Sequence, residues 1–149
     1  MRKSNEIPLY IIPIQEDGFH VFLEAKVNGT KVFMLLDTGA SRTVFDLETI
    51  KSIHKGIELE ENEDNATGLG TDSVKNFVAV IKKLEIGKIK LTDYEAGIID
   101  LSHVNSSYKR IAIPAIAGVL GSDLLVAFDG VINYKDKVLK LKKCELTSL

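Results

Sequence analysis

An apolar run that ends in an acid and a glycine turn constrains the fold of this chain more than any other segment. Residues 33–36 read Phe-Met-Leu-Leu, and residues 37–41 continue as Asp-Thr-Gly-Ala-Ser. Glycine lets the backbone bend close to the preceding acid, so the pattern predicts a carboxylate, that of Asp37, held at the end of a buried strand. The tripeptide occurs once, because the Asp-Gly pairs at 17–18 and 129–130 have no hydroxyl residue between acid and glycine.

Length and composition indicate one ordinary globular domain. The 149 residues are 45% hydrophobic and 27% charged with three prolines, which suits one domain over residues 1–149 with a substantial core. We expect residues 1–18 to form an N-terminal extension or strand and residues 19–142 to form the core. The net charge of −2 gives no footprint for nucleic acid. The lysines of segment 135–143 alternate with apolar residues, as on the wet face of a strand.

The sequence also bears on compartment and metal binding. The single cysteine, Cys144, excludes an internal disulfide framework. The apolar run at 9–12 is cut by Pro13 and makes a poor signal peptide, and no stretch approaches a membrane span. We therefore expect a cytoplasmic protein without a membrane partner, although a removed signal peptide would leave the same sequence. The histidines at 20, 54 and 103 show no metal-ligand spacing, so no metal or cofactor is expected.

Local patterns predict strands that deliver Asp37 to a loop. Residues 19–27 and 31–36 flank Asn28-Gly29, a strong hairpin signal. Residues 43–45 are expected to return as a strand, and Asp46 is placed to cap a short helix that begins at residue 47. In this interpretation the hairpin carries the acid and the following strand and helix hold its loop.

The second half of the chain repeats this order of elements faintly. Strands are expected over 74–84, 89–91 and 96–101, with a turn at 85–88, and a crossing loop over 102–117. Ser122 and Asp123 are placed to cap a helix over 124–128, and 130–134 with 138–141 form a final hairpin. The segments 28–50 and 87–128 thus share a hairpin, an apolar strand, a loop with an acid and a capped helix.

Three segments in a fixed order resemble one family. The Asp-Thr-Gly-Ala of residues 37–40 resembles the active-site loop of the retropepsin-like aspartic proteases. Residues 118–125, Gly-Val-Leu-Gly-Ser-Asp-Leu-Leu, resemble the second signature of that family, and the glycine-rich 67–71 lies where the family carries its flap. The resemblance covers residues 20–142 and implies an all-β fold with short helices, a retropepsin-like closed β-barrel (acid protease fold) that forms a single lobe.

The resemblance also implies the chemistry and the residues that perform it. Asp37 and its symmetry mate in a homodimer would share one proton, and the ionised member would activate a water for attack on a peptide carbonyl. Thr38 would tie the two loops together across the axis, and the Gly39 amide would face the carboxylates. The residues expected to bind substrate are Ala40, Gly68, Leu69 and Gly70. Neither a covalent intermediate nor a cofactor is required.

The sequence therefore predicts a homodimeric aspartic endopeptidase that takes a peptide or protein substrate. Apolar flanking residues should be accepted, since the candidate subsite residues are Leu36, Val44, Leu69, Val119 and Leu120. Ala40 stands where pepsin-like enzymes usually have a serine that stabilises the carboxylate charge, so we expect a less acidic pH optimum than a pepsin's.

Blander interpretations stay open. The chain could be a catalytically weak or inactive module of the same fold that binds peptides or dimerises, or a non-catalytic barrel with a fortuitous tripeptide. In those cases Asp37 would be a turn or helix cap, Gly68 and Gly70 plain turn glycines, and Asp123 a helix cap.

Overall fold

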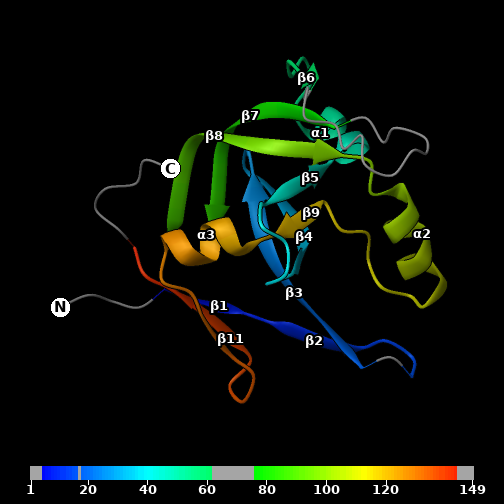
Figure 1. Ribbon diagram of the computed structural model, residues 1–149, viewed down its shortest axis with the longest axis vertical. Helices are drawn as coiled ribbons and strands as arrows, with labels where there is room; N and C mark the ends of the chain where they lie inside the picture. The colour runs from blue at the N-terminus through cyan, green and yellow to red at the C-terminus, as the bar shows by residue number, and fades with distance from the viewer. Residues whose placement is uncertain (1–4, 17, 62–75, 144–149) are drawn as a thin grey trace.

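The computed structural model describes residues 5–16, 18–61 and 76–143. Short strands dominate these residues, and three helices lie between them (Figure 1). The helices are α1 (Leu47–Ile53), α2 (Ser102–Arg110) and α3 (Ser122–Ala127). The strands are β1 (Asn5–Pro8), β2 (Tyr10–Pro13), β3 (Phe19–Val27), β4 (Thr30–Leu36), β5 (Val44–Asp46), β6 (Glu60–Glu61), β7 (Phe77–Ile86), β8 (Ile89–Ile99), β9 (Gly118–Leu120), β10 (Val131–Asn133) and β11 (Val138–Leu141).

The larger sheet closes on itself. Its strand order is β2-β3-β4-β9-β5-β8-β7-β6, and β3 pairs with β7 as well. The ring β3-β4-β9-β5-β8-β7 is therefore a closed barrel of six strands, which removes the free edges that an open sheet would expose. This confirms the predicted all-β fold with a closed barrel and short helices.

The hairpin that leads to Asp37 follows the predicted pattern. β3 and β4 pair antiparallel from Phe22–Leu35 to Val27–Thr30. Asn28 and Gly29 both have positive φ, 49° and 83°, which is what a two-residue turn of the right twist requires and what these residue types adopt most easily.

Two expectations for the second half were wrong. The strands predicted at 89–91 and 96–101 are one continuous strand, β8, because its polar residues alternate outward while Leu91, Tyr94, Ala96 and Ile98 stay buried. The loop predicted over 102–117 contains α2. This helix escaped detection because its sequence is polar and its first turn has no side-chain cap, while Tyr108 is its buried residue.

The two other helices begin differently from each other. Asp46 caps α1 as predicted, with its carboxylate accepting from the Thr49 amide at 3.2 Å and from the Leu101 amide at 2.8 Å. α3 has Gly121 at its N-cap and no side-chain cap. The expectation that Ser122 and Asp123 cap α3 was therefore wrong, and the Asp123 carboxylate serves another purpose described below.

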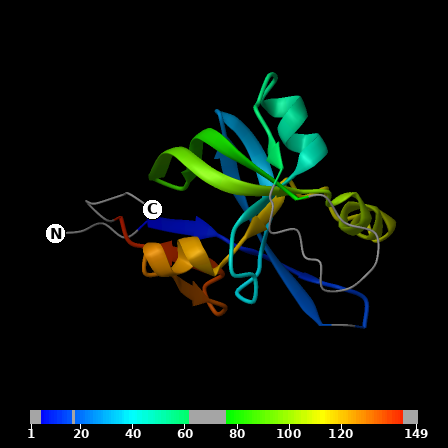
Figure 2. The same cartoon turned by 45° about the horizontal axis from the view of Figure 1, so that its top comes forward.

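Apolar side chains form two clusters on opposite sides of the strands. Alternate residues of β4 separate the two: Met34 and Leu36 enter the barrel core, whereas Phe33 and Leu35 face the second cluster. The second cluster is centred on Phe22, Leu101, Tyr108, Ile113 and Ile116. It is covered by α2 and the segment that follows, which lie at the right of the barrel in Figures 1 and 2.

A smaller sheet stands beside the barrel. Its order is β1-β11-β10, and β1 pairs antiparallel with β11 of the same chain from Asn5–Leu141 to Pro8–Val138. The buried Asn5 fastens β1 to the barrel, since its amide donates to the Ile86 carbonyl and its side-chain oxygen accepts from the Lys88 amide. Within the described residues, none of the helices has the length and apolar character needed to cross a membrane.

Candidate active site

Asp37 lies where two parallel strands end side by side. β4 pairs parallel with β9, from Met34–Gly118 to Leu36–Leu120. One step beyond this ladder, the Asp37 amide donates to the Leu120 carbonyl at 3.0 Å. The backbone of Asp37 is thus fixed by the barrel, while Asp37 and the next two residues are exposed in the single chain. The structure therefore holds a rigid carboxylate open to the surroundings.

The turn around the carboxylate is tight. The Gly39 amide donates to Asp37 Oδ1 at 2.9 Å, and the Ala40 amide donates to the Asp37 carbonyl at 3.1 Å. A Cβ atom at position 39 would lie 3.3 Å from Asp37 Oδ1, closer than an ordinary contact. A glycine therefore lets its amide approach the carboxylate, and one oxygen of Asp37 is engaged by the loop.

The segment that follows β9 contacts the Asp37 loop. The Ser122 amide donates to the Ala40 carbonyl at 2.8 Å. A Cβ atom on Gly121 would meet the Ala40 carbonyl oxygen and the Arg42 backbone at 2.8 Å. Gly121 is thus a packing glycine that allows the two loops to touch.

Asp123 forms a second, closed carboxylate cluster next to the loop. Its Oδ1 accepts from the Thr43 amide at 2.9 Å and from the Thr43 hydroxyl at 2.8 Å, and its Oδ2 accepts from the Tyr94 hydroxyl at 2.7 Å. The Thr43 hydroxyl in turn accepts from the Gly121 amide at 3.0 Å. Burial, and then the negative Asp123, raise the pKa of Tyr94 well above its usual range.

Sequence reasoning missed Thr43 and Tyr94 as partners of Asp123. Asp123 is 80 positions from Thr43 and 29 positions from Tyr94, so no local spacing relates them. They meet because β5 pairs parallel with β8, so that Thr43, just before β5, lies near Tyr94 on β8. Their cluster connects the loop of Asp37 to the start of α3.

A third polar contact lies on the same side of the strands as the second apolar cluster. His20 Nδ1 and the Tyr108 hydroxyl are 2.8 Å apart, which joins β3 to α2. Burial raises the pKa of Tyr108, and the negative charge of Asp37 raises it further. Tyr108 is therefore electrostatically coupled to Asp37, which the sequence did not indicate.

The structure separates the predicted substrate residues into groups. Ala40 is half-buried beside Asp37, whereas Gly68, Leu69 and Gly70 lie outside the described residues. Leu36 and Leu120 are buried in the barrel core, so the expectation that they line subsites was wrong. The alternation of β4 explains this, since Leu35 rather than Leu36 shares a face with Asp37. Val44 and Val119 are half-buried.

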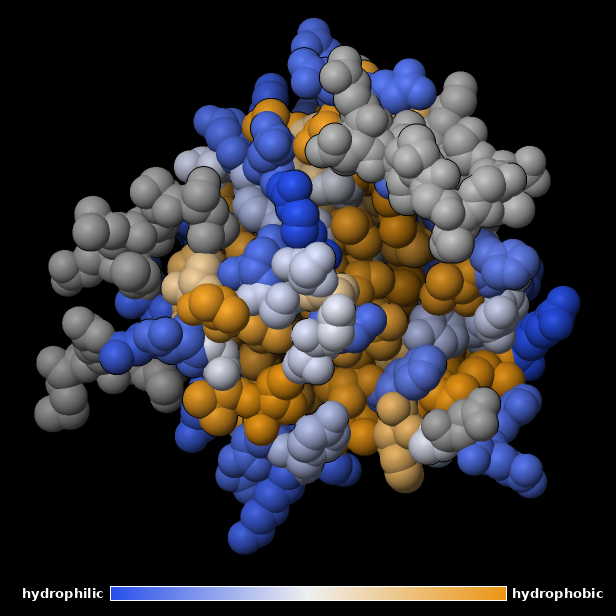
Figure 3. Space-filling view, in the orientation of Figure 1, coloured by the Kyte–Doolittle hydropathy of each residue, from blue (hydrophilic) through white to orange (hydrophobic). Residues whose placement is uncertain are grey.

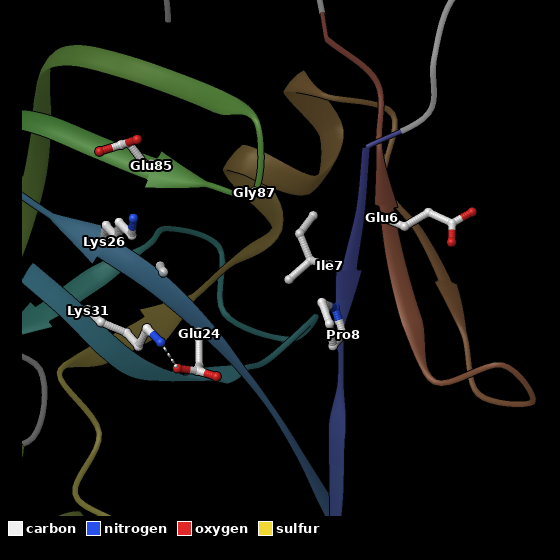
Figure 4. Close-up of a pocket in the computed structure, with 9 residues that line it drawn as sticks. Glu6, Ile7, Pro8, Glu24, Lys26, Lys31, Glu85 and Gly87 are labelled. Atoms are coloured by element: carbon white, nitrogen blue, oxygen red, sulfur yellow. Dashed lines mark ion pairs between the residues drawn. The ribbon is translucent and has the colours of Figure 1, made fainter. Parts of the chain in front are cut away.

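The surface has an apolar region and, elsewhere, a pocket lined by several charged residues. Figure 3 shows hydrophobic side chains gathered at the centre of the face beside α2. By contrast, a pocket of about 220 Å³ between β1, β3 and the β7–β8 turn carries paired charges (Figure 4). Its Lys31 Nζ lies 3.6 Å from Glu24 Oε2. This pocket lacks Asp37 and offers no comparable chemistry.

The described residues contain no group of three or more His, Cys, Asp or Glu side chains arranged to hold a metal ion. Near Asp37 the described residues offer carboxylate and hydroxyl groups, those of Asp37, Thr38 and Ser41. A carboxylate with one free oxygen can accept a proton from a water or a hydroxyl.

Solved structures similar to this chain have the same fold. A retropepsin-like aspartic protease from Rickettsia conorii matches with 22% identity and a TM-score of 0.54, covering 95% of this chain and 94% of that one. The retroviral protease-like domain of Ddi1 from Leishmania major matches with 12% identity and a TM-score of 0.52, covering 86% and 96%. At these identities the likeness establishes the fold alone. Among curated proteins the sequence has no match.

A family model described as aspartyl protease matches residues 23–124. That range begins in β3, contains the loop of Asp37 and ends in the first turn of α3. It therefore includes both loops that meet beside the carboxylate and spans more than half of the chain. The chain belongs to the aspartyl protease family, with a retropepsin-like fold.

Proposed function

We propose that the protein is an aspartic endopeptidase whose site forms between two copies of the chain, with Asp37 from each. The observation that carries this proposal is the geometry of the Asp-Thr-Gly turn. It presents an exposed carboxylate on a backbone fixed by β9, with the Gly39 amide on one of its oxygens. Family membership supports the proposal as well.

In this proposal the two Asp37 carboxylates face each other and share one proton. Like charges a few ångströms apart cannot both ionise cheaply. The ionised carboxylate takes a proton from a bound water, which attacks the peptide carbonyl, and the protonated one donates to the developing oxyanion. The Gly39 amide bond keeps each carboxylate oriented in the loop. Thr38 is exposed at the same turn, and in this proposal it joins the two loops.

A second copy is the simplest source of the second carboxylate. Asp123, the acid in the corresponding loop of the second half, is already committed to Thr43 and Tyr94. Two exposed apolar side chains lie on the elements that follow Ser122 in the chain: Val126 on α3 is 77% exposed and Val131 on β10 is 55% exposed. We infer that this surface, together with the Asp37 loop, receives the partner.

The experiment is mass-spectrometric cleavage of a proteome-derived peptide library between pH 4 and 7, at high protein concentration. Wild type is compared with Asp37→Asn, which removes the carboxylate chemistry and keeps the size of the side chain. Cleavage that vanishes in the variant supports the acid mechanism. Cleavage that persists in Asp37→Asn contradicts the proposal, and its cause would lie elsewhere or in a contaminant.

The role of the partner is tested separately. Val126→Asp places a charge on the proposed contact surface and should lower both the dimer fraction, measured by analytical ultracentrifugation, and the cleavage rate. The matched control is Val80→Asp, an exposed valine on β7 that should leave both unchanged. A wild type that is dimeric but cleaves no peptide would favour a peptide-binding module of the same fold.

A further inference from the structure

The His20–Tyr108 pair belongs to neither the barrel core nor the Asp37 turn, and it has a definite position relative to Asp37. The β3–β4 ladder ends at the pair Phe22–Leu35. His20 lies two residues before Phe22 on β3, and Asp37 lies two residues after Leu35, just beyond the end of β4. Residues two apart share one face of a strand, so both extend the face that carries Phe22 and Leu35.

Ring contacts confirm that His20 lies on this face. Its ring centroid is 6.4 Å from that of Phe22 and 5.8 Å from that of Tyr108, and Phe22 stacks on Phe33 at 4.9 Å. The pair is thus a polar contact at the edge of an aromatic wall. The raised pKa of Tyr108, to which the charge of Asp37 contributes, agrees with this placement.

Tyr108 is held in place from several directions. The Leu101 amide donates to Asp46 at the start of α2, and Asn105 exchanges two hydrogen bonds with the backbone of Ile116, at 2.7 and 3.1 Å. The Tyr108 carbonyl accepts from the Ile113 amide at 2.9 Å. Tyr108 itself is buried, so its hydroxyl has a fixed position and can orient the His20 ring.

The hydrogen bond determines how His20 presents its ring. A buried hydroxyl is stabilised by donating its proton to an acceptor, and His20 Nδ1, 2.8 Å away, is the hydrogen-bond partner that the described residues provide for it. We infer that Nδ1 accepts this bond, which leaves the proton of the neutral ring on Nε2. Because His20 is only half-buried, its Nε2–H edge is available as a donor.

We propose that His20 is a specificity-determining residue of the peptidase, and that Tyr108 is the positioning residue that orients its donor. The Nε2–H group donates a hydrogen bond to a substrate side chain at a position flanking the scissile bond. That side chain has an aliphatic stem and a neutral oxygen at its end, as in glutamine. The stem would lie along the aromatic wall, since binding pockets combine apolar walls with few polar groups. A carboxylate is disfavoured there by the negative charge of Asp37. This inference rests on the proposed function.

The test compares two peptides that differ in one flanking residue, which is glutamine in one and methionine in the other. The side chains of these two residues are similar in length. With wild type we expect a higher kcat/KM for the glutamine peptide. In His20→Phe, which keeps a ring and removes the donor, the glutamine-to-methionine ratio should fall about 3- to 10-fold. The ratio cancels any effect of the variant that is common to both peptides, and a circular dichroism spectrum that matches wild type shows that the variant is folded. An unchanged ratio overturns the proposal.

Tyr108→Phe tests the positioning role with a readout that packing alone does not move. The ¹⁵N shifts of the imidazole report which nitrogen carries the proton. We expect the Nε2–H form in wild type and a mixture of both forms in Tyr108→Phe, with an intermediate peptide ratio. A wild-type ring protonated at Nδ1 instead would contradict the inference.

Failure of the proposed function is distinguishable from failure of this inference. If neither wild type nor Asp37→Asn cleaves any peptide, the peptidase proposal fails. The same two peptides are then titrated into the Asp37→Asn chain while the His20 resonances are followed. A shift of Nε2 with the glutamine peptide, and none with the methionine peptide, supports the donor site. Equal responses to both peptides reject it.

Discussion

Asp37 and Asp123 stand at corresponding places in the two halves of the chain and have opposite surroundings. Each follows an apolar strand of the barrel, β4 or β9, near a glycine-containing loop. Asp37 is exposed and, within the described residues, its carboxylate accepts one hydrogen bond, from the Gly39 amide. Asp123 accepts three, two from Thr43 and one from Tyr94.

The difference shows how donors decide the role of a carboxylate. An ionised carboxylate can accept about four hydrogen bonds. Asp123 uses three of these hydrogen bonds to connect α3 with β8 and with the residue before β5. It therefore stabilises the fold and can accept few further hydrogen bonds from a ligand. Among the described residues no hydrogen bond occupies the second oxygen of Asp37, whose backbone is fixed by β9, which suits it to chemistry. Four substitutions test this division between activity and stability.

The largest expected effect is that of Asp37→Asn on activity. Removing the proposed general base should lower kcat/KM by about 10³-fold or more. The free energy of unfolding should change by less than about 0.5 kcal/mol, because an exposed side chain with one backbone partner is replaced by one of equal size. Peptide cleavage and urea denaturation measure the two quantities. A large loss of stability would contradict the division.

Asp123→Asn should show the reverse pattern. An amide in place of the carboxylate turns one acceptor into a donor facing the Thr43 or Tyr94 donors, and charged hydrogen bonds become neutral. We expect a loss of about 2–3 kcal/mol in the free energy of unfolding. Urea denaturation at pH 7 provides the measurement. Unchanged stability would mean that Asp123 is as dispensable to the fold as Asp37.

Thr43→Val isolates the hydroxyl at the centre of the cluster. It removes the bond to Asp123 and the acceptor for the Gly121 amide, in a residue with no exposed surface. The expected cost is about 1–3 kcal/mol, since a buried donor loses its partner. Thr38→Val, at the exposed turn, is the matched control and should be much less destabilising.

Tyr94→Phe should have the smallest effect, about 1 kcal/mol at pH 7 from one lost hydrogen bond. It also makes a pH prediction. Burial and Asp123 raise the folded-state pKa of Tyr94 above its unfolded value, which is about 10. Wild type therefore keeps this stabilisation below pH 10 and loses it as the pH rises further. Unfolding measured from pH 8 to 11 should show a shallower decline in the variant.

The sequence predicted well those features that local chemistry determines. Asn28-Gly29 specified the β3–β4 turn because few other residues adopt positive φ readily. Asp46 specified the start of α1 through its own side chain. The placement of Asp37 after a buried strand followed from the same kind of local pattern.

Features that depend on distant partners were beyond local patterns. α2 is polar, and what holds it is its contacts with residues far along the chain, Asp46 and His20. Asp123 looked like a cap because caps are the common use of an acid at a helix start, yet its partners come from β5 and β8. Leu36 was misplaced because a one-residue error in strand phase exchanges the two faces.

The pairing of β1 with β11 of the same chain has a consequence for assembly. Each chain completes its small sheet without help from a second copy, so folding need not wait for association. At concentrations where single chains predominate, the midpoint of unfolding should then vary little with protein concentration, whereas cleavage per chain should rise with concentration until the proposed dimers predominate. Such a protein would be regulated by its abundance: dilution would switch off the reaction while leaving folded chains ready to pair again.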